Sequence, residues 1–279
     1  MTRAPQGWAA LAAHIRAHPV EGSPARRRAA FLALSCGGPA GRDEAIGGVR
    51  CVRHGPEGGV PVLWLHGGGL VFGSPESHAA GAARLAALTG RPVILPDYRL
   101  APDHPWPAPL DDTLAVIDAL APGIDLAGDS AGGLLALCAA LARPGRIGRL
   151  ALISPNTDRS GQSLTRAANS PRDLMNDDAT DAALARLAFG GAPPATARPL
   201  EADLSALPPV WITASTDEVL ADDALLLIRA LGLARVPVTA EIRAIPSHMW
   251  TLWPEATPEA QATYASLARA LARRDAPPP

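Results

Sequence analysis

Short strand-like segments alternate along the chain with longer segments whose apolar residues recur at helical spacing. The strand-like segments are residues 49–53, 60–65, 92–95, 124–128, 150–154, 210–215 and 238–245. The helix-like segments between and after them are residues 79–88, 110–120, 131–143, 222–233 and 259–273. Strands that alternate with helices predict an α/β fold with a mainly parallel central sheet and helices on both faces.

Two helical segments, residues 6–18 and 24–34, precede every predicted strand, so they cannot connect consecutive strands of the sheet. A second region, residues 155–206, is polar and irregular, with one helical piece at residues 178–189. The N-terminal helices are consistent either with a cap or with an arm on the flank of the domain, and the pattern alone leaves both open. We see no internal repeat.

The segment from Ile124 to Gly145 combines a buried strand, a sharp turn and an Ala/Leu-rich helix, and Ser130 lies at the turn. Its sequence Gly128-Asp129-Ser130-Ala131-Gly132 fits G-x-S-x-G, the nucleophile elbow. On so tight a turn, side chains two residues to either side of the serine would collide with the neighbouring strand and helix, which explains the glycines. The turn places Ser130 at a helix N-terminus, where unpaired N–H groups favour negative charge. A plain strand-to-helix turn with a capping serine is the structural alternative.

Further candidate residues follow other predicted strands, at the edge of the sheet where open parallel sheets place their sites. His66-Gly67-Gly68-Gly69 follows residues 60–65, and its uncovered backbone N–H groups suit an oxyanion hole, with the Ala131 N–H as another donor. A phosphate loop would have Lys-Ser/Thr after the glycines, whereas this chain has Leu70-Val71-Phe72.

Asp217 follows the strand 210–215, and His248 follows the last strand. The order Ser130, Asp217, His248 is that of an α/β-hydrolase triad. In such a triad the serine attacks an acyl carbonyl, the histidine shuttles its proton and the acid orients the imidazole. Taken singly, Asp217 is also a plausible helix cap next to another carboxylate, Glu218, and His248 a plausible loop histidine.

Composition excludes several other classes of protein. The formal net charge of −2 over 279 residues gives no reason to expect a nucleic-acid partner. The three cysteines are scattered without metal-like spacing, and their odd number argues against a disulfide framework. Residues 1–22 lack the apolar segment of a secretory signal, and no apolar run reaches the roughly 18 residues of a membrane span. We therefore expect a cytoplasmic protein.

The motifs together resemble the hormone-sensitive lipase family of bacterial esterases, in the branch whose elbow is G-D-S-A-G. The resemblance rests on His66-Gly67-Gly68-Gly69, residues 97–107 (DYRLAPDHPWP), Gly128 to Gly133, Asp217 and His248, and it spans about residues 60–253. It implies an α/β-hydrolase fold, a serine carboxylesterase activity, no cofactor and no metal. It also implies a helical cap, formed by residues 1–45 and by part of residues 155–205, on a catalytic domain at residues 46–279.

The resemblance also implies oxyanion donors at Gly67, Gly68 and Ala131. The position after the glycines is often aromatic in the family but is Leu70 in this chain, which bears on the shape of the substrate pocket. Trp250 and Trp253, just past His248, are candidate pocket walls, with ordinary core packing as the alternative.

The leading hypothesis is the hydrolysis of short-to-medium-chain acyl esters of small molecules through an acyl-serine intermediate. A lactonase, or a deacetylase of a hydroxylated natural product, would use the same triad with a different pocket. A non-catalytic small-molecule receptor is the alternative from another class, and the presence of His248 argues against it. A homodimer is common in the family, but no patch in the sequence demonstrates one.

Overall fold

The computed structural model describes residues 4–272 and contains one eight-stranded sheet with the order β1-β2-β4-β3-β5-β6-β7-β8. The strands are β1 Arg42–Ile46, β2 Val49–His54, β3 Val62–Leu65, β4 Val93–Pro96, β5 Ile124–Asp129, β6 Ile147–Ile153, β7 Val210–Ser215 and β8 Val238–Arg243. β1 and β2 form an antiparallel hairpin, and β2 pairs antiparallel with β4. From β4 through β3 and β5 to β8 every pairing is parallel. The predicted mainly parallel sheet is confirmed.

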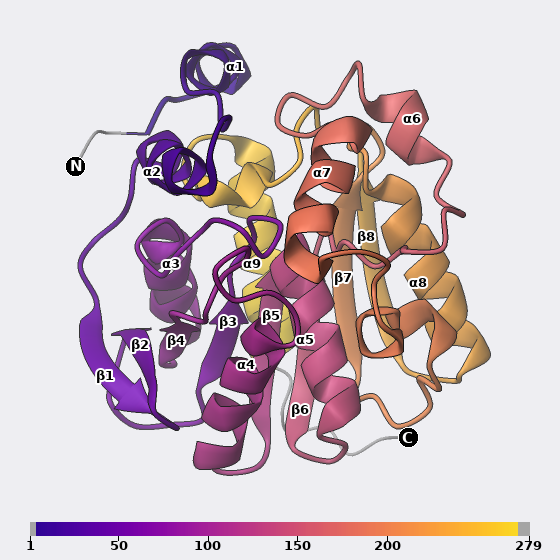
Figure 1. Cartoon of the computed structure of the whole chain (residues 1–279). Helices are drawn as coiled ribbons and strands as arrows, with labels where there is room; N and C mark the ends of the chain where they lie inside the picture. The colour runs from indigo at the N-terminus through magenta and orange to yellow at the C-terminus, as the bar shows by residue number, and fades with distance from the viewer. Residues whose placement is uncertain (1–3, 273–279) are drawn as a thin grey trace.

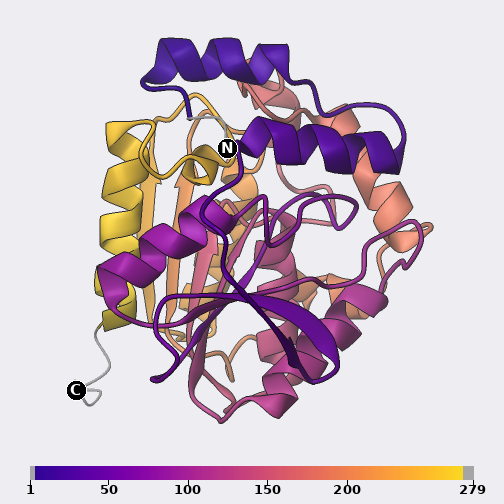
Figure 2. The ribbon, with the colours of Figure 1, turned by 90° about the vertical axis from the view of Figure 1, so that its left-hand side faces the viewer.

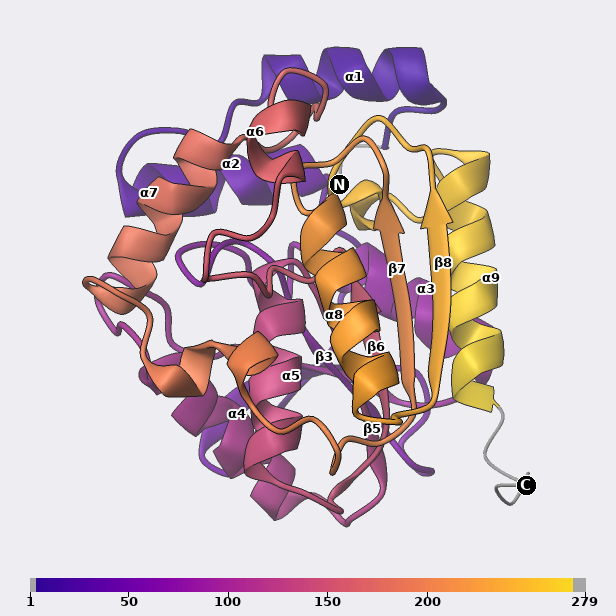
Figure 3. The ribbon, with the colours of Figure 1, turned by 90° about the vertical axis from the view of Figure 1, so that its right-hand side faces the viewer.

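Helices cover both faces of this sheet, as Figures 1 and 3 show. The helices are α1 Trp8–Ala17, α2 Pro24–Ser35, α3 Ala79–Thr89, α4 Ala108–Ala119, α5 Ala131–Ala142, α6 Thr165–Asn169, α7 Asp178–Phe189, α8 Ala221–Leu233 and α9 Pro258–Ala272. Helices α3 and α9 pack on one face, whereas α4, α5 and α8 pack on the other. None of the helices formed by residues 4–272 is long and apolar enough to cross a lipid bilayer.

The alternation of side chains along the central strands builds two apolar layers. In β3, Leu63 and Leu65 join the larger core with α5, whereas Val62 and Trp64 join the core beneath α3 and α9. All four side chains are at most 1% exposed. A strand that is covered on both faces has no solvent side, which explains why residues 62–65 are continuously apolar.

Four helices outside these two layers gather over the carboxyl ends of the parallel strands. Helices α1 and α2 lie across this end of the molecule in Figure 2, and Figure 3 shows α6 and α7 beside them. Strands β7 and β8 point toward the same end. Segments from the N-terminus and from the middle of the chain therefore lie together above the edge of the sheet where the predicted site residues follow their strands.

The structure differs from the sequence-based expectation at two elements. Strand β1 was not predicted, because its sequence Arg-Asp-Glu-Ala-Ile is mostly polar and exposed at the edge of the sheet. It begins at Arg42, ahead of the predicted domain boundary at residue 46. Helix α6 was not predicted because its five residues are too few to display helical periodicity. The last helix, predicted over 259–273, ends at Ala272, and residue 273 lies outside the described residues.

Candidate functional site

Ser130 occupies the turn between β5 and α5 in a backbone conformation that is strained for a residue with a side chain. Its φ is 54° and its ψ is −122°, outside the common regions for L-residues. A Cβ at Gly128 would collide with the carbonyl of Gly132, and a Cβ at Gly132 would collide with the carbonyl of Leu65 on β3. The glycines are therefore required by the close approach of strand and helix, as the sequence predicted. The turn places the Ser130 side chain at the cavity described below.

A chain of two hydrogen bonds links Ser130 to a carboxylate through His248. Ser130 Oγ lies 2.9 Å from His248 Nε2, and His248 Nδ1 lies 2.7 Å from Glu218 Oε2. The other carboxylate oxygen of Glu218 accepts a hydrogen bond of 2.8 Å from the Ser215 N–H, which fixes the side chain at the end of β7. Because Nδ1 faces a carboxylate, it carries the proton, and Nε2 is left to accept the proton of Ser130.

The residue that contacts the imidazole is Glu218, and the prediction of Asp217 is corrected. Glu218 is fully buried, whereas the side chain of Asp217 is half-buried and makes no hydrogen bond or ion pair with any of residues 4–272. The Asp217 backbone N–H instead donates to Ser215 Oγ and helps to close the turn. Successive residues of such a turn point in different directions, and only the second carboxylate points at His248. The neighbouring Glu218 in the sequence was the signal for this alternative.

The surroundings of His248 favour its protonated form. Burial disfavours the imidazolium, but the hydrogen bond and the negative charge of Glu218 outweigh this effect. The carboxylates of Asp173 and Asp129 act in the same direction, so the pKa of His248 is raised above its usual value of 6.5. An imidazole in this environment is a stronger base toward the Ser130 hydroxyl than a free one.

The glycine loop His66–Gly69 is held to the turn that carries Ser130 by the buried carboxylate of Asp129. Its Oδ2 accepts hydrogen bonds from the Gly67 N–H (3.1 Å) and from His78 Nε2 (3.2 Å), and its Oδ1 accepts one from Trp64 Nε1 (2.8 Å). The Gly67 N–H is therefore not available to a substrate, and the prediction of Gly67 as an oxyanion donor is corrected.

The two glycines that follow Gly67 keep N–H groups that could serve a substrate. The N–H groups of Gly68, Gly69 and Ala131 have no acceptor among residues 4–272, and Gly68 and Gly69 line a cavity together with Ser130. Both glycines have a positive φ, 121° and 64°, which suits residues without a Cβ. Which of the three glycines faces the site depends on this local twist, and the sequence motif does not encode it.

A small cavity of about 60 Å³ lies in front of Ser130 and His248. Its lining combines residues of the hydrolase core with residues of α2, α7 and the segments next to them. The lining residues are Val20, Arg27, Phe31, Gly68, Gly69, Phe72, Ser130, Met175, Asn176, Thr180, Asp181, Leu184, His248 and Met249.

The three predicted pocket residues lie elsewhere in the structure. Leu70 is buried in the core, Trp250 Nε1 donates to Thr263 Oγ1 of α9, and Trp253 Nε1 donates to the Leu34 carbonyl of α2. None of the three is among the residues that line this cavity within the described part of the chain. The two tryptophans therefore pack structural helices, which was the stated alternative, and the pocket prediction is corrected.

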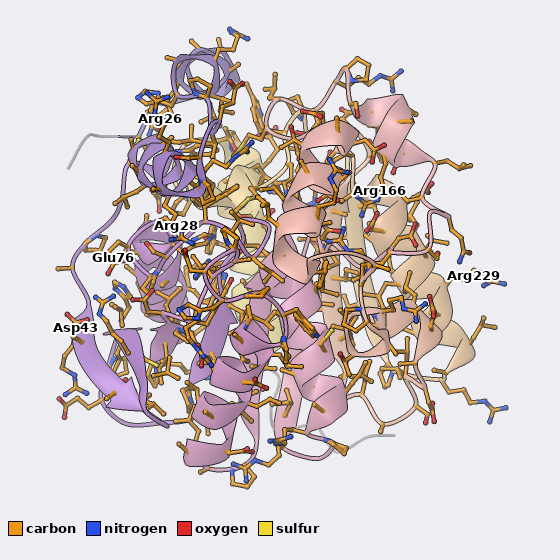
Figure 4. All side chains as sticks on the ribbon, in the orientation of Figure 1. Arg26, Arg28, Asp43, Glu76, Arg166 and Arg229 are labelled. Atoms are coloured by element: carbon orange, nitrogen blue, oxygen red, sulfur yellow. The ribbon has the colours of Figure 1, made fainter. Side chains whose placement is uncertain are left out.

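A buried network of ion pairs behind the cavity was not predicted. Arg166 of α6, labelled in Figure 4, pairs with Asp181 of α7 (2.5 Å) and with Asp223 of α8 (2.8 Å). Arg159 also pairs with Asp181, at 3.1 Å. Burial would raise the pKa of Asp181, but the two arginines and the Asn156 amide outweigh it and lower that pKa. The network joins α6, α7 and α8, whose residues are far apart in sequence, so only the folded chain reveals their partnership.

The comparisons with known proteins agree with this geometry. Residues 62–251 match the alpha/beta hydrolase fold family. The chain belongs to this family. An esterase from the bacterial hormone-sensitive lipase family has the same fold, with a TM-score of 0.88, 28% sequence identity and coverage of 95% of this chain and 97% of that chain. The hormone-sensitive lipase homolog EstE7 from a metagenome library gives a TM-score of 0.86 and 28% identity, covering 95% of this chain and 97% of that chain.

Relatives in sequence point to the same class of enzyme. An acetyl-hydrolase of Streptomyces hygroscopicus is 34% identical over 220 residues, which cover 75% of this chain and 74% of that protein. Carboxylesterase NlhH of Mycobacterium tuberculosis is 36% identical over 200 residues, 63% of this chain and 62% of its own length. These findings confirm the predicted fold, the membership of the hormone-sensitive lipase family and the predicted class of enzyme, a carboxylic ester hydrolase.

Proposed function

We propose that this protein is a serine carboxylesterase that hydrolyses small-molecule esters with short acyl chains through an acyl-serine intermediate. The observation that carries the proposal is the continuous hydrogen-bonded chain from Ser130 through His248 to Glu218 at the wall of a cavity. The free N–H groups of Gly68, Gly69 and Ala131 beside the same serine support it.

The geometry supports the following sequence of steps. Ser130 Oγ attacks the ester carbonyl while His248 Nε2 takes the serine proton, and Glu218 stabilises the resulting imidazolium. The carbonyl oxygen becomes negative and accepts hydrogen bonds from Gly68, Gly69 and Ala131. The tetrahedral intermediate then collapses, and His248 returns its proton to the leaving alcohol. Water, deprotonated by the same imidazole, attacks the acyl-serine, and the imidazolium returns this proton to Ser130 Oγ as the acid is released.

The size of the cavity favours the short end of the acyl range. A cavity needs about 10–15 Å³ of such space to hold one water molecule, so about 60 Å³ holds a group of only a few non-hydrogen atoms. An acetyl or propionyl group is of this size, whereas a long chain requires the walls to move. Two of these walls, Phe31 of α2 and Leu184 of α7, belong to helices that lie over the sheet edge. We therefore propose that α1, α2, α6 and α7 form the cap and limit the length of the acyl chain.

A second candidate function is the removal of an acetyl group from a larger hydroxylated molecule. Two observations favour it, namely the small cavity and the Streptomyces relative, which is an acetyl-hydrolase. The chemistry at Ser130 is identical in both cases, and only the leaving alcohol differs.

The test is the hydrolysis of p-nitrophenyl esters, from acetate to palmitate, by the wild-type protein and by Ser130→Ala. Ser154→Ala is the matched control, because this serine ends the neighbouring strand, is fully buried and has a hydroxyl without a hydrogen-bond partner among residues 4–272. A serine-directed phosphonate, followed by mass spectrometry of the labelled peptide, identifies the nucleophile independently of turnover.

We expect turnover that is highest for acetate or propionate, is lost in Ser130→Ala and is retained in Ser154→Ala, with phosphonate attached to Ser130. A Ser130→Ala protein that keeps wild-type activity would overturn the assignment of the nucleophile. Highest turnover on palmitate would overturn the assignment of this cavity as the acyl site.

A further inference from the structure

The side chain of Asn169, at the end of α6, binds the loop that carries Glu218. Asn169, the last residue of α6, donates from Nδ2 to the carbonyls of Thr216 (2.8 Å) and of Glu218 itself (2.9 Å). Asn169 is 4% exposed, and its bond to the Glu218 carbonyl is buried. The backbone on either side of Asp217 is therefore held by a residue that comes from a different part of the chain.

Asp173, four residues further on, binds both the acid loop and the histidine loop. Its Oδ2 accepts a hydrogen bond of 3.1 Å from the Val219 N–H, and its Oδ1 accepts one of 2.9 Å from the His248 N–H. Oδ1 also accepts from Met175 N–H at 3.0 Å, which orients the carboxylate. A single carboxylate thus links the residue after Glu218 to His248, and Glu218 and His248 are 30 positions apart in sequence.

This link matters because the two loops must hold their separation to a fraction of an ångström. The imidazole can orient correctly toward Ser130 only while Glu218 and His248 stay in hydrogen-bond contact, and a displacement of about 1 Å costs on the order of 100-fold in rate. Hydrogen bonds to a charged acceptor are stronger than neutral ones, so a carboxylate is well suited to hold two backbone amides. Asp173 does not line the cavity, so it contacts the machinery and not the substrate.

We propose that Asp173, on the segment that follows α6, is a positioning residue for the Glu218–His248 pair and acts together with Asn169 at the end of α6. The proposal rests on the proposed function, since it assigns a role in the same reaction. By this proposal the region between β6 and β7 affects the rate of catalysis as well as the size of the substrate that fits. The cap segment and the triad are then mechanically connected through Asp173.

The charge of Asp173 has a second, separable effect on His248. The charged groups that act on the imidazole are Glu218 from the acid loop, Asp173 from the segment after α6 and Asp129 from the elbow, and Asp181 and Arg27 line the same cavity. Negative charge stabilises the imidazolium, so loss of the Asp173 charge lowers the pKa of His248. The acid limb of the pH–rate profile then moves to lower pH, because the neutral base persists to lower pH.

The test compares Asp173→Ala and Asp173→Asn with Asp178→Asn. The asparagine variant removes the negative charge and one of the two acceptor oxygens but keeps an amide oxygen toward the His248 N–H. The alanine variant removes the charge and both acceptor oxygens. Asp178 is the matched control, because it lies on α7 and its carboxylate makes no hydrogen bond or ion pair with any of residues 4–272. The measurements are kcat and KM for p-nitrophenyl acetate against pH, and the pKa of His248 by NMR of the ¹⁵N-labelled imidazole, which needs no turnover.

We expect kcat to fall about 10- to 100-fold in Asp173→Ala with KM within about twofold of wild type, in line with the cost of misplacing a catalytic group. Asp173→Asn should recover part of kcat and show a lower pKa of His248, and Asp178→Asn should match the wild type in both.

Wild-type kcat and an unchanged pKa of His248 in both Asp173 variants would overturn the proposal, as would an equal effect of Asp178→Asn. A wild-type protein that hydrolyses no ester would overturn the proposed function instead, and the NMR measurement would still decide the role of Asp173. If Asp173→Ala fails to fold, Asp173→Asn gives the same decision through its pKa and kcat.

Discussion

Of the adjacent carboxylates Asp217 and Glu218, only Glu218 contacts His248. We therefore predict that substitutions of the two residues affect catalysis unequally. Glu218→Gln keeps the size of the side chain but removes the charge that stabilises the imidazolium. We expect kcat for p-nitrophenyl acetate to fall by about 100-fold or more, since loss of the acid in such triads costs on the order of 10⁴. Asp217→Asn should stay within about twofold of the wild type, because its carboxylate has no partner among residues 4–272.

The opposite pattern, a large loss in Asp217→Asn and a small one in Glu218→Gln, would show that the acid loop rearranges during the reaction. Circular dichroism of both variants guards against misfolding, because Glu218 also accepts the buried Ser215 N–H.

The raised pKa of His248 gives a prediction for the wild-type enzyme. The neutral imidazole is the base, so activity is present above the pKa of His248 and is lost as the pH falls through it. Because Glu218, Asp173 and Asp129 raise that pKa, the acid limb of kcat/KM should lie above 6.5. A profile of kcat/KM between pH 5 and 9 measures it, and an acid limb well below 6.5 would contradict the electrostatic picture of the site.

Ser130 and His248 could be predicted from the sequence, whereas their exact partners could not. Ser130 lies in a sequence motif and His248 follows the last strand, and no adjacent residue of the same type competes with either for its role. For the acid and for the oxyanion donors the sequence offered two or three adjacent residues of the right type, and the choice depended on the twist of a turn. In the structure Glu218, and not Asp217, contacts His248, and the Gly67 N–H donates to Asp129, which leaves Gly68 and Gly69 as the glycine donors of the proposed oxyanion hole.

Helix α6 connects α7 to α8 through Arg166. We predict that replacing the Arg166 side chain destabilises the protein. Arg166→Met leaves the carboxylates of Asp181 and Asp223 buried without their strongest partner. Breaking a buried pair in this way costs about 3–5 kcal/mol. Chemical denaturation measures the loss as a lower midpoint.

Arg143→Met is the matched control, because the pair of Arg143 with Asp118 is exposed and surface pairs contribute little. Equal midpoints for the two variants would show that the buried network contributes no more than a surface ion pair.

At the level of elements, periodicity predicted the strands and helices that have a buried face, and it failed where burial is absent or brief. The segments of β7 and α7 match their predicted bounds, because each has a long apolar face. Strand β1 is a polar edge strand whose pairing comes from the hairpin with β2, and α6 is fixed by the side-chain contacts of Arg166 and Asn169. Such elements depend on partners that are distant in the sequence, so a local pattern cannot reveal them.

Across the whole molecule, the parallel sheet determines where chemistry is possible. Strands β3, β5 and β7 end at the same edge, and the loops after them carry the glycines of the proposed oxyanion hole, Ser130 and Glu218. The helices over that edge close the cavity and, through Asp173, contact the acid loop and His248. This arrangement explains why the order of motifs along the chain sufficed to predict the fold.

The stability of the whole molecule should also depend on pH through a buried histidine that catalysis does not use. His66 is fully buried, is stacked on Tyr98 with ring centroids 4.2 Å apart, and has an Nε2 without a partner among residues 4–272. Burial, with the neighbouring His78 acting in the same direction, lowers the pKa of His66 to about 3. In the unfolded chain the pKa is near 6.5, so between these values the unfolded state binds a proton that the folded state does not.

Stability therefore falls as the pH is lowered from about 6.5 toward 3, by up to about 1.4 kcal/mol per pH unit from this residue. His66→Phe keeps the stacking on Tyr98 and removes the titration, so its free energy of unfolding should depend less on pH. Asp223, whose burial raises its pKa to about 6, has the opposite slope between about 4 and 6, but it is present in both proteins and cancels in their difference. Urea denaturation of both proteins between pH 4.5 and 7 measures that difference, and parallel curves would mean that folding does not lower the pKa of His66.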